Sequence, residues 1–428
     1  MTPLCFARGN QKQNYYAHRL GVTAWFGLLT ARTTKRDPRS FLREEYDRLA
    51  AQDLDWRIRV LASNSGPWTV VSEKKVMMLC SNNYLNLTNH PKVKKAALEA
   101  IEKYGAGSGS VRPIAGTMSA HVELEQALAR YKRTEAALAY STGFATNAGL
   151  IPQLASEGDL IISDELNHGS IIDGVRLSRA ERAVYKHCNP DDLKHVLDEA
   201  EQKSYKHILI VTDGVFSMDG DIAPADRIVE LAEQHGAMTY IDDAHGDGVL
   251  GEAGRGITSH HHIDGRVDVE MGTFSKAFGV VGGYIAGSRD LVNFALNKSR
   301  TWLLSGSHPA SVVASCKASL DVIQDEPIHL QKLWENTRYF KEGLRGLGFN
   351  IGNSETPITP VIVGESSTAR KMSEMLFGEN VFALPIVFPM VARDKARIRT
   401  IMNAGHTKKD LDFALKAFEK VGKSLKAI

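Results

Sequence analysis

Apolar, strand-like runs alternate with amphipathic helical stretches through the middle of the chain. The runs typical of strands cover 136–140, 158–163, 206–214, 237–243 and 267–274. Apolar residues recur three and four positions apart, as on one face of a helix, over 91–104, 146–154, 191–202 and 225–235. Alternation of this kind predicts βαβ units and a mainly parallel sheet, so the expected fold class is α/β.

The flanks of this region have different patterns. A helical stripe over 40–62 precedes it, and beyond about residue 320 the pattern predicts helices over 330–347, 368–376 and 409–425 with extended segments over 357–364 and 396–403. The sequence therefore predicts four parts: a basic arm over 1–39, a lead-in segment over 40–88, a large domain over 89–320 and a small α+β domain over 321–428.

Composition restricts the classes of partner. The 428 residues include 52 Lys and Arg against 50 Asp and Glu, and 7% are aromatic. A net charge of +2 gives no field that would attract nucleic acid, and no run of 18 apolar residues is available to span a membrane. The four cysteines form no CxxC pair. These features favour an enzyme of a reducing compartment, the cytoplasm, that acts on small molecules.

The first 36 residues are an exception in charge. They contain six Lys and Arg and neither Asp nor Glu. This composition resembles a transit peptide, which would place the protein in the mitochondrial matrix. An extended start, or a basic arm that lies on a partner subunit, is also consistent with it, and we favour these two interpretations.

Polar side chains gather where the predicted strands end. Five strand ends read 141-STGF-144, 163-SDELNH-168, 213-DGVFSMDG-220, 242-DDAHG-246 and 273-TFSK-276. In a doubly wound sheet the ligand lies beyond the carboxyl ends of the strands. One polar loop carries little information, but five coincident strand ends predict an active site.

Lys276 and Asp242 indicate the chemistry of that site. Lys276 follows an apolar strand among small residues, where partial desolvation would lower its pKa towards nucleophilic use. Asp242 ends the neighbouring predicted strand, and pyridoxal 5'-phosphate needs a carboxylate to keep its ring nitrogen protonated. We therefore expect Lys276 to form a Schiff base with this cofactor. His168 and His245 would contact the cofactor or the substrate, although each is equally consistent with a structural loop histidine.

The phosphate of the cofactor has a predicted site of its own. Gly143 and Phe144 precede the helix over 146–154, so their N–H groups can bind a phosphate with the help of the helix dipole. Thr273 offers a hydroxyl to the same group.

Two other motifs favour different interpretations. The glycines of 105-GAGSGS-110 miss the GxGxxG spacing and follow a helix, so this segment is predicted to be a flexible active-site loop and not a dinucleotide site. His260, His261 and His262 are consecutive and would point in alternating directions, and no Cys or further His is placed to complete a set. We therefore predict no metal site.

Longer motifs resemble those of the α-oxoamine synthases, pyridoxal-phosphate enzymes with the type I aminotransferase fold. The resemblance runs from about residue 79 to the C-terminus and includes 82-NNYL-85, 165-ELNHGSIIDGVRLS-178, 213-DGVFSMDGDIAP-224, 241-IDDAHGDGVLGEAGRG-256, 273-TFSKAFG-279 and 396-ARIRTIMNAGHT-407. Within the family, these motifs look most similar to those of the glycine C-acetyltransferases, also called 2-amino-3-ketobutyrate CoA ligases. The resemblance implies a homodimer with shared active sites.

The resemblance also implies a role for each site residue. Lys276 is the Schiff-base lysine, Asp242 is the partner of the pyridinium nitrogen, and His168 stacks on the ring. Further cofactor contacts are implied at Gly143, Phe144, Ser217, His245 and Thr273, with Ser305 and Gly306 reaching the phosphate from the other subunit, and substrate contacts at Asn82 and Arg399. Arg399 would bind the carboxylate of the amino acid through its guanidinium fork.

The sequence departs from the family in two places. Asn86 stands where the family usually has Gly, and 391-VARDK-395 replaces a Pro-x-Gly stretch before the final arginines. Because Asn tolerates a positive φ, we expect the turn at Asn86 to be retained.

The implied reaction condenses glycine with acetyl-CoA to 2-amino-3-oxobutyrate and CoA. Lys276, as a free base, would remove a Cα proton, and the ring supported by Asp242 would hold the carbanion. The alternatives within the family are serine palmitoyltransferase and 8-amino-7-oxononanoate synthase activities. A non-catalytic partner subunit and a simple aminotransferase are the alternatives of other kinds, and the presence of Lys276 and Asp242 argues against the first of them.

Overall fold

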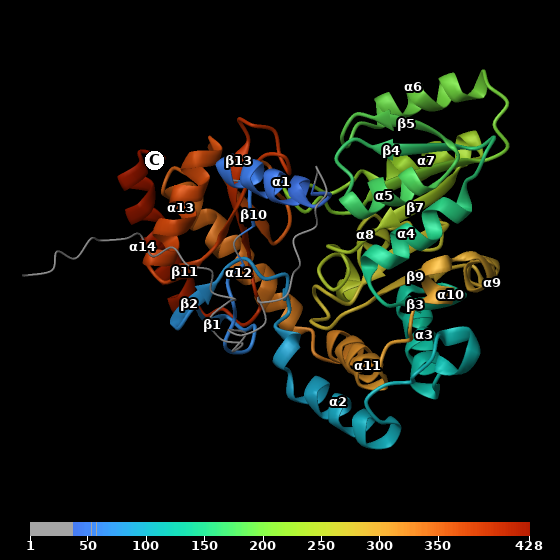
Figure 1. Cartoon of the computed structure of the whole chain (residues 1–428), viewed down its shortest axis with the longest axis horizontal. Coiled ribbons are helices and arrows are strands. Elements are labelled where there is room, and N and C mark those ends of the chain that lie inside the picture. The colour runs from blue at the N-terminus through green and yellow to red at the C-terminus, as the bar shows by residue number, and fades with distance from the viewer. Residues whose placement is uncertain (1–36, 53, 57) are drawn as a thin grey trace, which may run out of the picture. The chain divides into compact units, whose positions relative to one another are not determined.

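The structure is a computed structural model that describes residues 37–428 apart from Asp53 and Arg57 (Figure 1). Residues 1–36 lie outside the described part of the chain, so the role of this basic segment stays a prediction. The chain divides into two compact units between Arg59 and Val60.

The first unit contains one helix, α1 (Ser40–Ala51), among its described residues. The predicted helix over 40–62 is therefore wrong in its second half. Asp55 follows closely on the end of α1, where the helix dipole disfavours a negative charge, and aspartate is a weak helix former. The apolar stripe alone was too weak a signal for the end of this helix.

A seven-stranded sheet is the centre of the second unit, with the order β3-β9-β8-β7-β6-β4-β5. Its strands are β3 (Ala136–Tyr140), β4 (Leu160–Asp164), β5 (Glu181–Tyr185), β6 (Ile208–Asp213), β7 (Met238–Asp242), β8 (Val269–Thr273) and β9 (Gly283–Gly287). The strands from β5 to β8 pair in parallel, whereas β9 is antiparallel to both β3 and β8. The predicted mainly parallel sheet is confirmed.

Helices cover both faces of this sheet. Ile161 of β4 packs in one apolar cluster with α4 (Gly143–Leu154) and α5 (Gly169–Leu177). Its neighbours Leu160 and Ile162 pack in another cluster, with α6 (Pro190–Glu201) and α7 (Ala225–His235). Alternate residues of a strand point to opposite faces, so β4 is buried on both sides.

Two small sheets and further helices complete the second unit. The sheets are β1-β2-β11 and β10-β13-β12, built from β1 (Trp68–Val71), β2 (Lys74–Met78), β10 (Ile358–Gly364), β11 (Val381–Phe382), β12 (Leu384–Ile386) and β13 (Ala396–Ile401). The helices include α2 (Pro91–Tyr104), α3 (Ser119–Lys132), α9 (Arg289–Lys298), α10 (Arg300–Leu304), α11 (Ala310–Asp325), α12 (Ile328–Gly346), α13 (Ser366–Gly378) and α14 (Lys408–Leu425). Strand β2 pairs with β11, so the predicted lead-in segment and the C-terminal region share a sheet. The predicted domain boundaries remain predictions.

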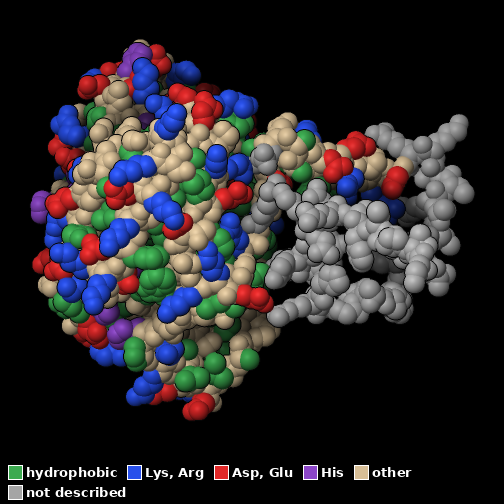
Figure 2. Space-filling model, turned by 90° about the vertical axis from the view of Figure 1, so that its left-hand side faces the viewer, with side chains coloured by type: hydrophobic (Ala, Val, Ile, Leu, Met, Phe, Trp, Pro, Cys, Tyr) green, Lys and Arg blue, Asp and Glu red, His purple; other side chains and the backbone are tan. Residues whose placement is uncertain are grey.

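The surface carries charges of both signs. Figure 2 shows Lys and Arg interspersed with Asp and Glu over one face. This mixture agrees with the net charge of +2. No helix among the described residues is long and apolar enough to cross a membrane.

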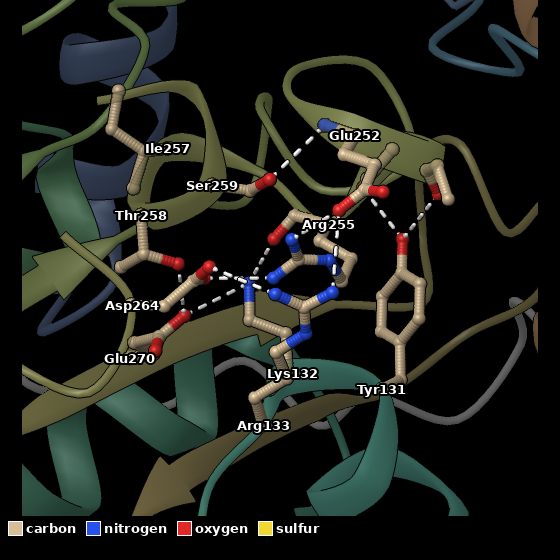
Figure 3. A network of polar contacts seen from close by, with 12 residues as sticks. Tyr131, Lys132, Arg133, Glu252, Arg255, Ile257, Thr258, Ser259, Asp264 and Glu270 are labelled. Carbon is tan, nitrogen blue, oxygen red and sulfur yellow. Dashed lines mark hydrogen bonds and ion pairs between the residues drawn. The ribbon is translucent and has the colours of Figure 1, made fainter. Parts of the chain in front are cut away.

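A buried ion cluster surrounds Lys132, which Figure 3 shows together with Glu270 and Arg255. Lys132, the last residue of α3, has a side chain that is 1% exposed. Its Nζ lies 2.9 Å from Asp247 Oδ1, 3.0 Å from Glu270 Oε2 and 3.5 Å from Asp243 Oδ2, and it donates to the Arg255 carbonyl at 2.7 Å. Burial raises the pKa of each of the three carboxyls, and the ammonium acts against that rise. One cation therefore holds three acidic side chains together.

We expect Lys132→Met to lower the free energy of unfolding by about 3–5 kcal/mol, because it removes the counter-charge of a buried cluster. Urea unfolding followed by tryptophan fluorescence measures the change. Lys94→Met, at an exposed position of α2, is the control and should change the same quantity by less than about 0.5 kcal/mol. Equal stability of the two variants would contradict the role given to Lys132.

Candidate active site

The turn after β7 and the loop after β8 bring the principal predicted residues together. Asp242 is the last residue of β7, and His245 lies in the turn that follows it. Lys276 lies in the loop between β8 and β9. The charges of Asp242 and Lys276 both act on the pKa of His168, which places the three side chains in one site.

The Asp242 carboxylate is 3% exposed and firmly held. Its Oδ2 accepts a hydrogen bond from Asn147 Nδ2 at 2.7 Å, and its Oδ1 accepts one from the Ala244 N–H at 3.0 Å. Asn147 also donates to Ser170 Oγ at 2.8 Å and accepts from the Tyr240 hydroxyl at 2.7 Å. Asn147 was not predicted to be a site residue. An asparagine among apolar residues, one turn into a helix, could have indicated a buried polar contact.

Lys276 has the pKa shift that its sequence setting predicts. Burial lowers the pKa of its ammonium to about 8, while the carboxylates of Asp242 and Asp213 act to raise it. Asp213 pairs with Asp242 in the register of β6 and β7, and burial together with Asp242 raises its own pKa. A lysine with a pKa near 8 is partly neutral at neutral pH and can therefore act as nucleophile or base.

The two predicted histidines are held in different ways. His168 caps α5, and its ring Nδ1 lies 2.7 Å from Ser170 Oγ. The backbone N–H of His168 donates to Asp213 Oδ2 at 2.7 Å. His245 is buried, and its Nδ1 lies 2.7 Å from the hydroxyl of Tyr84. Burial lowers the pKa of both imidazoles, so both are neutral at neutral pH. Tyr84 belongs to the 82-NNYL-85 motif but was not predicted to be a site residue.

The predicted phosphate contacts lie at the start of α4. The first turn of a helix leaves N–H groups without acceptors in the helix, which here include those of Gly143 and Phe144. A Cβ at Gly143 would lie 3.1 Å from Met271 Cε and 3.2 Å from Thr273 Oγ1, so the glycine leaves room beside Thr273. The Thr273 hydroxyl donates to the Gly282 carbonyl at 2.7 Å. Its oxygen accepts the Ser275 N–H at 3.3 Å, so in this conformation the hydroxyl has no proton to donate to a phosphate.

Arg399 and Ser217 meet at the other side of the site. Arg399 Nη1 donates to the carbonyl of Ser217 at 3.2 Å, and its charge acts on the pKa of both Lys276 and His245. Arg397, two positions earlier, is paired with Asp219. Of the two arginines on β13, Arg399 is thus the one whose charge reaches the site.

The predicted residues of the lead-in segment are Asn82, in the 82-NNYL-85 motif, and Asn86, directly after it. The Asn82 Oδ1 atom is buried and has no hydrogen-bond partner among the described residues. Asn86 has a φ of 60°, so the expectation that asparagine keeps this turn is confirmed.

Ser305 and Gly306 come from a different segment of the chain than the other predicted phosphate contacts. They follow α10, and Gly306 pairs with Val111 in an isolated bridge. Within the described residues, no hydrogen bond joins them to Gly143, Phe144 or Thr273. A contact to the phosphate from the partner subunit therefore stays a proposal. The 105-GAGSGS-110 segment lies beside them, since Ser108 Oγ is 2.6 Å from Ser307 Oγ.

These residues fit pyridoxal phosphate in their chemistry. The site combines a buried carboxylate held on both oxygens, a lysine of lowered pKa, and a helix N-terminus that a glycine leaves open. Together with the mainly parallel sheet, they define a pyridoxal-phosphate enzyme of the type I aminotransferase fold.

Comparisons with known proteins agree with this assignment to the type I aminotransferase fold. The sequence profile of the family described as aminotransferase class I and II matches residues 74–418. The chain is 52% identical over 388 residues to an 8-amino-7-oxononanoate synthase of Thermoanaerobacter pseudethanolicus, covering 91% of this chain and 98% of the relative. It is 54% identical over 385 residues to one of Symbiobacterium thermophilum, covering 90% and 98%.

Solved structures of serine palmitoyltransferases are similar as well. The enzyme from S. paucimobilis with bound PLP matches with a TM-score of 0.86 at 30% identity, covering 92% of this chain and 100% of that one. The Sphingomonas wittichii enzyme matches with a TM-score of 0.87 at 30% identity and the same coverage. The chain belongs to the aminotransferase class I and II family, and within it is a pyridoxal-phosphate-dependent α-oxoamine synthase. The predicted fold class and cofactor are confirmed, whereas the names of these relatives do not support glycine C-acetyltransferase.

Cofactor-free protein should bind pyridoxal phosphate at a rate that rises with pH about a midpoint near 8, because only the neutral Lys276 amine attacks the aldehyde. A lysine with an ordinary pKa of about 10.4 would give a rate still rising at pH 10. Stopped-flow absorbance of the lysine-bound cofactor between pH 6.5 and 10 measures this midpoint. Lys276→Ala is the control and should never develop that absorbance. A midpoint above pH 10 would contradict the lowered pKa.

Proposed function

We propose that this protein is an α-oxoamine synthase that forms 8-amino-7-oxononanoate. The observation that carries the proposal is identity of 52% and 54%, over about nine-tenths of the chain, to two proteins of that name. This reaction replaces the condensation of glycine with acetyl-CoA, which the sequence motifs favoured, as the proposed activity.

The structure of the named product defines its substrates. An α-oxoamine synthase bonds the Cα of an amino acid to the carbonyl carbon of an acyl thioester. In 8-amino-7-oxononanoate the amine-bearing carbon carries one methyl group, as the Cα of alanine does, and the ketone carbon is the end of a pimeloyl chain. The substrates are therefore alanine and a pimeloyl thioester. The alanine carboxyl group leaves as CO2 and the thiol leaves as CoA.

The residues of the site divide this chemistry among them. When bound, pyridoxal phosphate supplies an electron sink for the charge that develops at Cα. Lys276 would hold the cofactor and, as a neutral amine, would accept the Cα proton of the amino acid at Nζ. Asp242, held by Asn147, keeps a proton on the ring nitrogen. His168 would contact the ring of the cofactor, and His245, held by Tyr84, would hydrogen-bond the cofactor or the substrate.

The remaining residues bind and orient. Gly143 and Phe144 donate their N–H groups to the phosphate, beside the Thr273 oxygen. Arg399, anchored on the Ser217 carbonyl, binds the carboxylate of the amino acid as an ion pair. Asn82 contributes its unpartnered Oδ1 as an acceptor for the substrate amine.

We expect the highest kcat/KM for alanine with pimeloyl-CoA in a grid of glycine, alanine and serine against acetyl-, pimeloyl- and palmitoyl-CoA. A pocket that accepts the alanine methyl should favour it over glycine by roughly 10–200-fold. Release of CoA, followed with a thiol reagent, and release of CO2 measure the reaction.

Lys276→Ala, with its melting temperature checked, is the control for this grid and should release no CoA above background. A maximum at glycine with acetyl-CoA would restore the interpretation drawn from the motifs, and a maximum at serine with palmitoyl-CoA would indicate a serine palmitoyltransferase. Absence of CoA release from every pair would favour the non-catalytic subunit.

We propose further that the protein is a homodimer with shared active sites. Ser305 and Gly306 match residues that, in the family, reach the phosphate from the other subunit. A second copy of the chain would supply these two residues to each site.

Mixing two inactive variants tests this arrangement. Lys276→Ala, refolded at equal amounts with a variant that carries Ser305→Ala and Gly306→Val, should restore about a quarter of the parent sites, since half of the dimers are mixed and each has one whole site. CoA release by the refolded mixture measures the recovery. Mixed dimers without activity would place each site within a single chain.

A further inference from the structure

Three metal-ligating side chains converge outside the active site. His90 is the N-cap of α2, Glu326 is the C-cap of α11, and His329 lies in the first turn of α12. Their ligand atoms all lie within 4.8 Å of one another. The side chains are 15%, 27% and 23% exposed, so an ion can reach them from solvent.

Two of the distances within this cluster suit a metal ion. Nε2 of His90 lies 3.5 Å, and Nε2 of His329 lies 3.4 Å, from the same oxygen, Oε2 of Glu326. Around a tetrahedral zinc ion with ligands at about 2.0–2.2 Å, neighbouring ligand atoms are about 3.3–3.5 Å apart. Both separations are longer than an ordinary N–H···O hydrogen bond, which is about 2.7–3.2 Å. Two histidines and one glutamate are also a donor set that zinc uses in proteins.

Lys92 leaves the shared carboxylate oxygen open. Its Nζ lies 2.8 Å from Oε1 of Glu326, the oxygen that neither histidine faces. The Lys92 side chain is 62% exposed, so it can turn towards solvent when an ion binds at Oε2.

A second cluster with ligand atoms within 4.8 Å of one another, Asp164, His187 and Cys188, is not open to a metal ion. Nδ1 of His187 lies 3.0 Å from Asp164 Oδ1, and its Nε2 lies 3.4 Å from Asp221 Oδ2. Burial acts to lower the pKa of His187, but the bonds to these two carboxylates raise it to about 12. The imidazole is therefore protonated and has no lone pair for a metal. Asp164 also accepts the N–H of Cys188 at 2.9 Å, so this cluster is an ion pair.

We propose that His90, Glu326 and His329 form a binding site for a divalent transition-metal ion, with Zn²⁺ as the preferred ion and water as its fourth ligand. The ion would join the start of α2 to the junction between α11 and α12, whose ends these three residues occupy. Helix α2 follows directly on the segment that contains Asn82 and Tyr84, so the ion would hold that segment from outside the active site. This site does not depend on which amino acid and acyl group the enzyme uses.

Titration calorimetry with Zn²⁺ alone tests the site, using chelator-treated protein loaded with pyridoxal phosphate. The parent should bind one equivalent per chain that His329→Ala loses or binds at least about tenfold more weakly. Glu326→Gln keeps both imidazoles and should weaken binding similarly. Zn²⁺ should raise the melting temperature of the parent, because an ion that binds only the folded state stabilises it, and should leave that of both variants unchanged.

His195→Ala is the matched control. His195 Nε2 lies 3.3 Å from Glu199 Oε1 on the surface of α6, a pair with one imidazole only. This variant should bind Zn²⁺ like the parent. Any Zn²⁺ binding by histidines that none of the variants replaces is the same in every protein compared. Far-ultraviolet circular dichroism and the cofactor spectrum, unchanged without Zn²⁺, show that each variant is folded. Equal Zn²⁺ binding by the parent and His329→Ala, or no stoichiometric binding by the parent, would overturn the proposal.

Discussion

The ammonium of Lys132 is the constraint on which the site depends. Its two partners on the turn after β7 are Asp243, which follows directly on Asp242, and Asp247, two residues beyond His245. These two ion pairs restrain the turn on both sides of His245. A buried ion cluster of this kind is seldom more stabilising than apolar packing, and we interpret it as a device that selects one geometry for the turn. The cluster also reaches the site through its field, because Asp243 acts to raise the pKa of Lys276.

Helix α4 is the second element that positions residues of the site, because it carries both Gly143 and Asn147. Its first residue, Gly143, opens the predicted phosphate site, and four residues later Asn147 holds Asp242. At about 1.5 Å per residue, these two points are about 6 Å apart along one rigid helix. One helix and one turn thus set the distance between the contacts for the two ends of the cofactor. A site on packed elements is more precise than one on free loops.

The sequence predicted what local pattern determines and missed what tertiary contacts determine. Strands β4, β6, β7 and β8 were predictable because they are continuous apolar runs, whereas β9 (Gly283–Gly287) begins and ends in glycine and owes its place to antiparallel pairing with β3 and β8. Lys276 and Asp242 were recognisable at strand ends. Tyr84, which holds His245, is 161 positions away from it, and no local signal joins the two. The same holds for His90 and Glu326, which packing of α2 against α11 brings together.

The choice of substrate shows the same limit in another form. The motifs that carry the family resemblance contain Lys276, Asp242, His245 and Arg399, residues whose proposed partners are the cofactor and the amino acid carboxylate. Every α-oxoamine synthase must perform that part of the chemistry, so these motifs cannot separate acetyl from pimeloyl. The acyl chain is selected by apolar walls, where each buried methylene contributes about 0.8 kcal/mol without any recognisable motif. Identity above 50% over nine-tenths of the chain includes those walls, and it is therefore better evidence for the acyl group than the resemblance of the catalytic motifs.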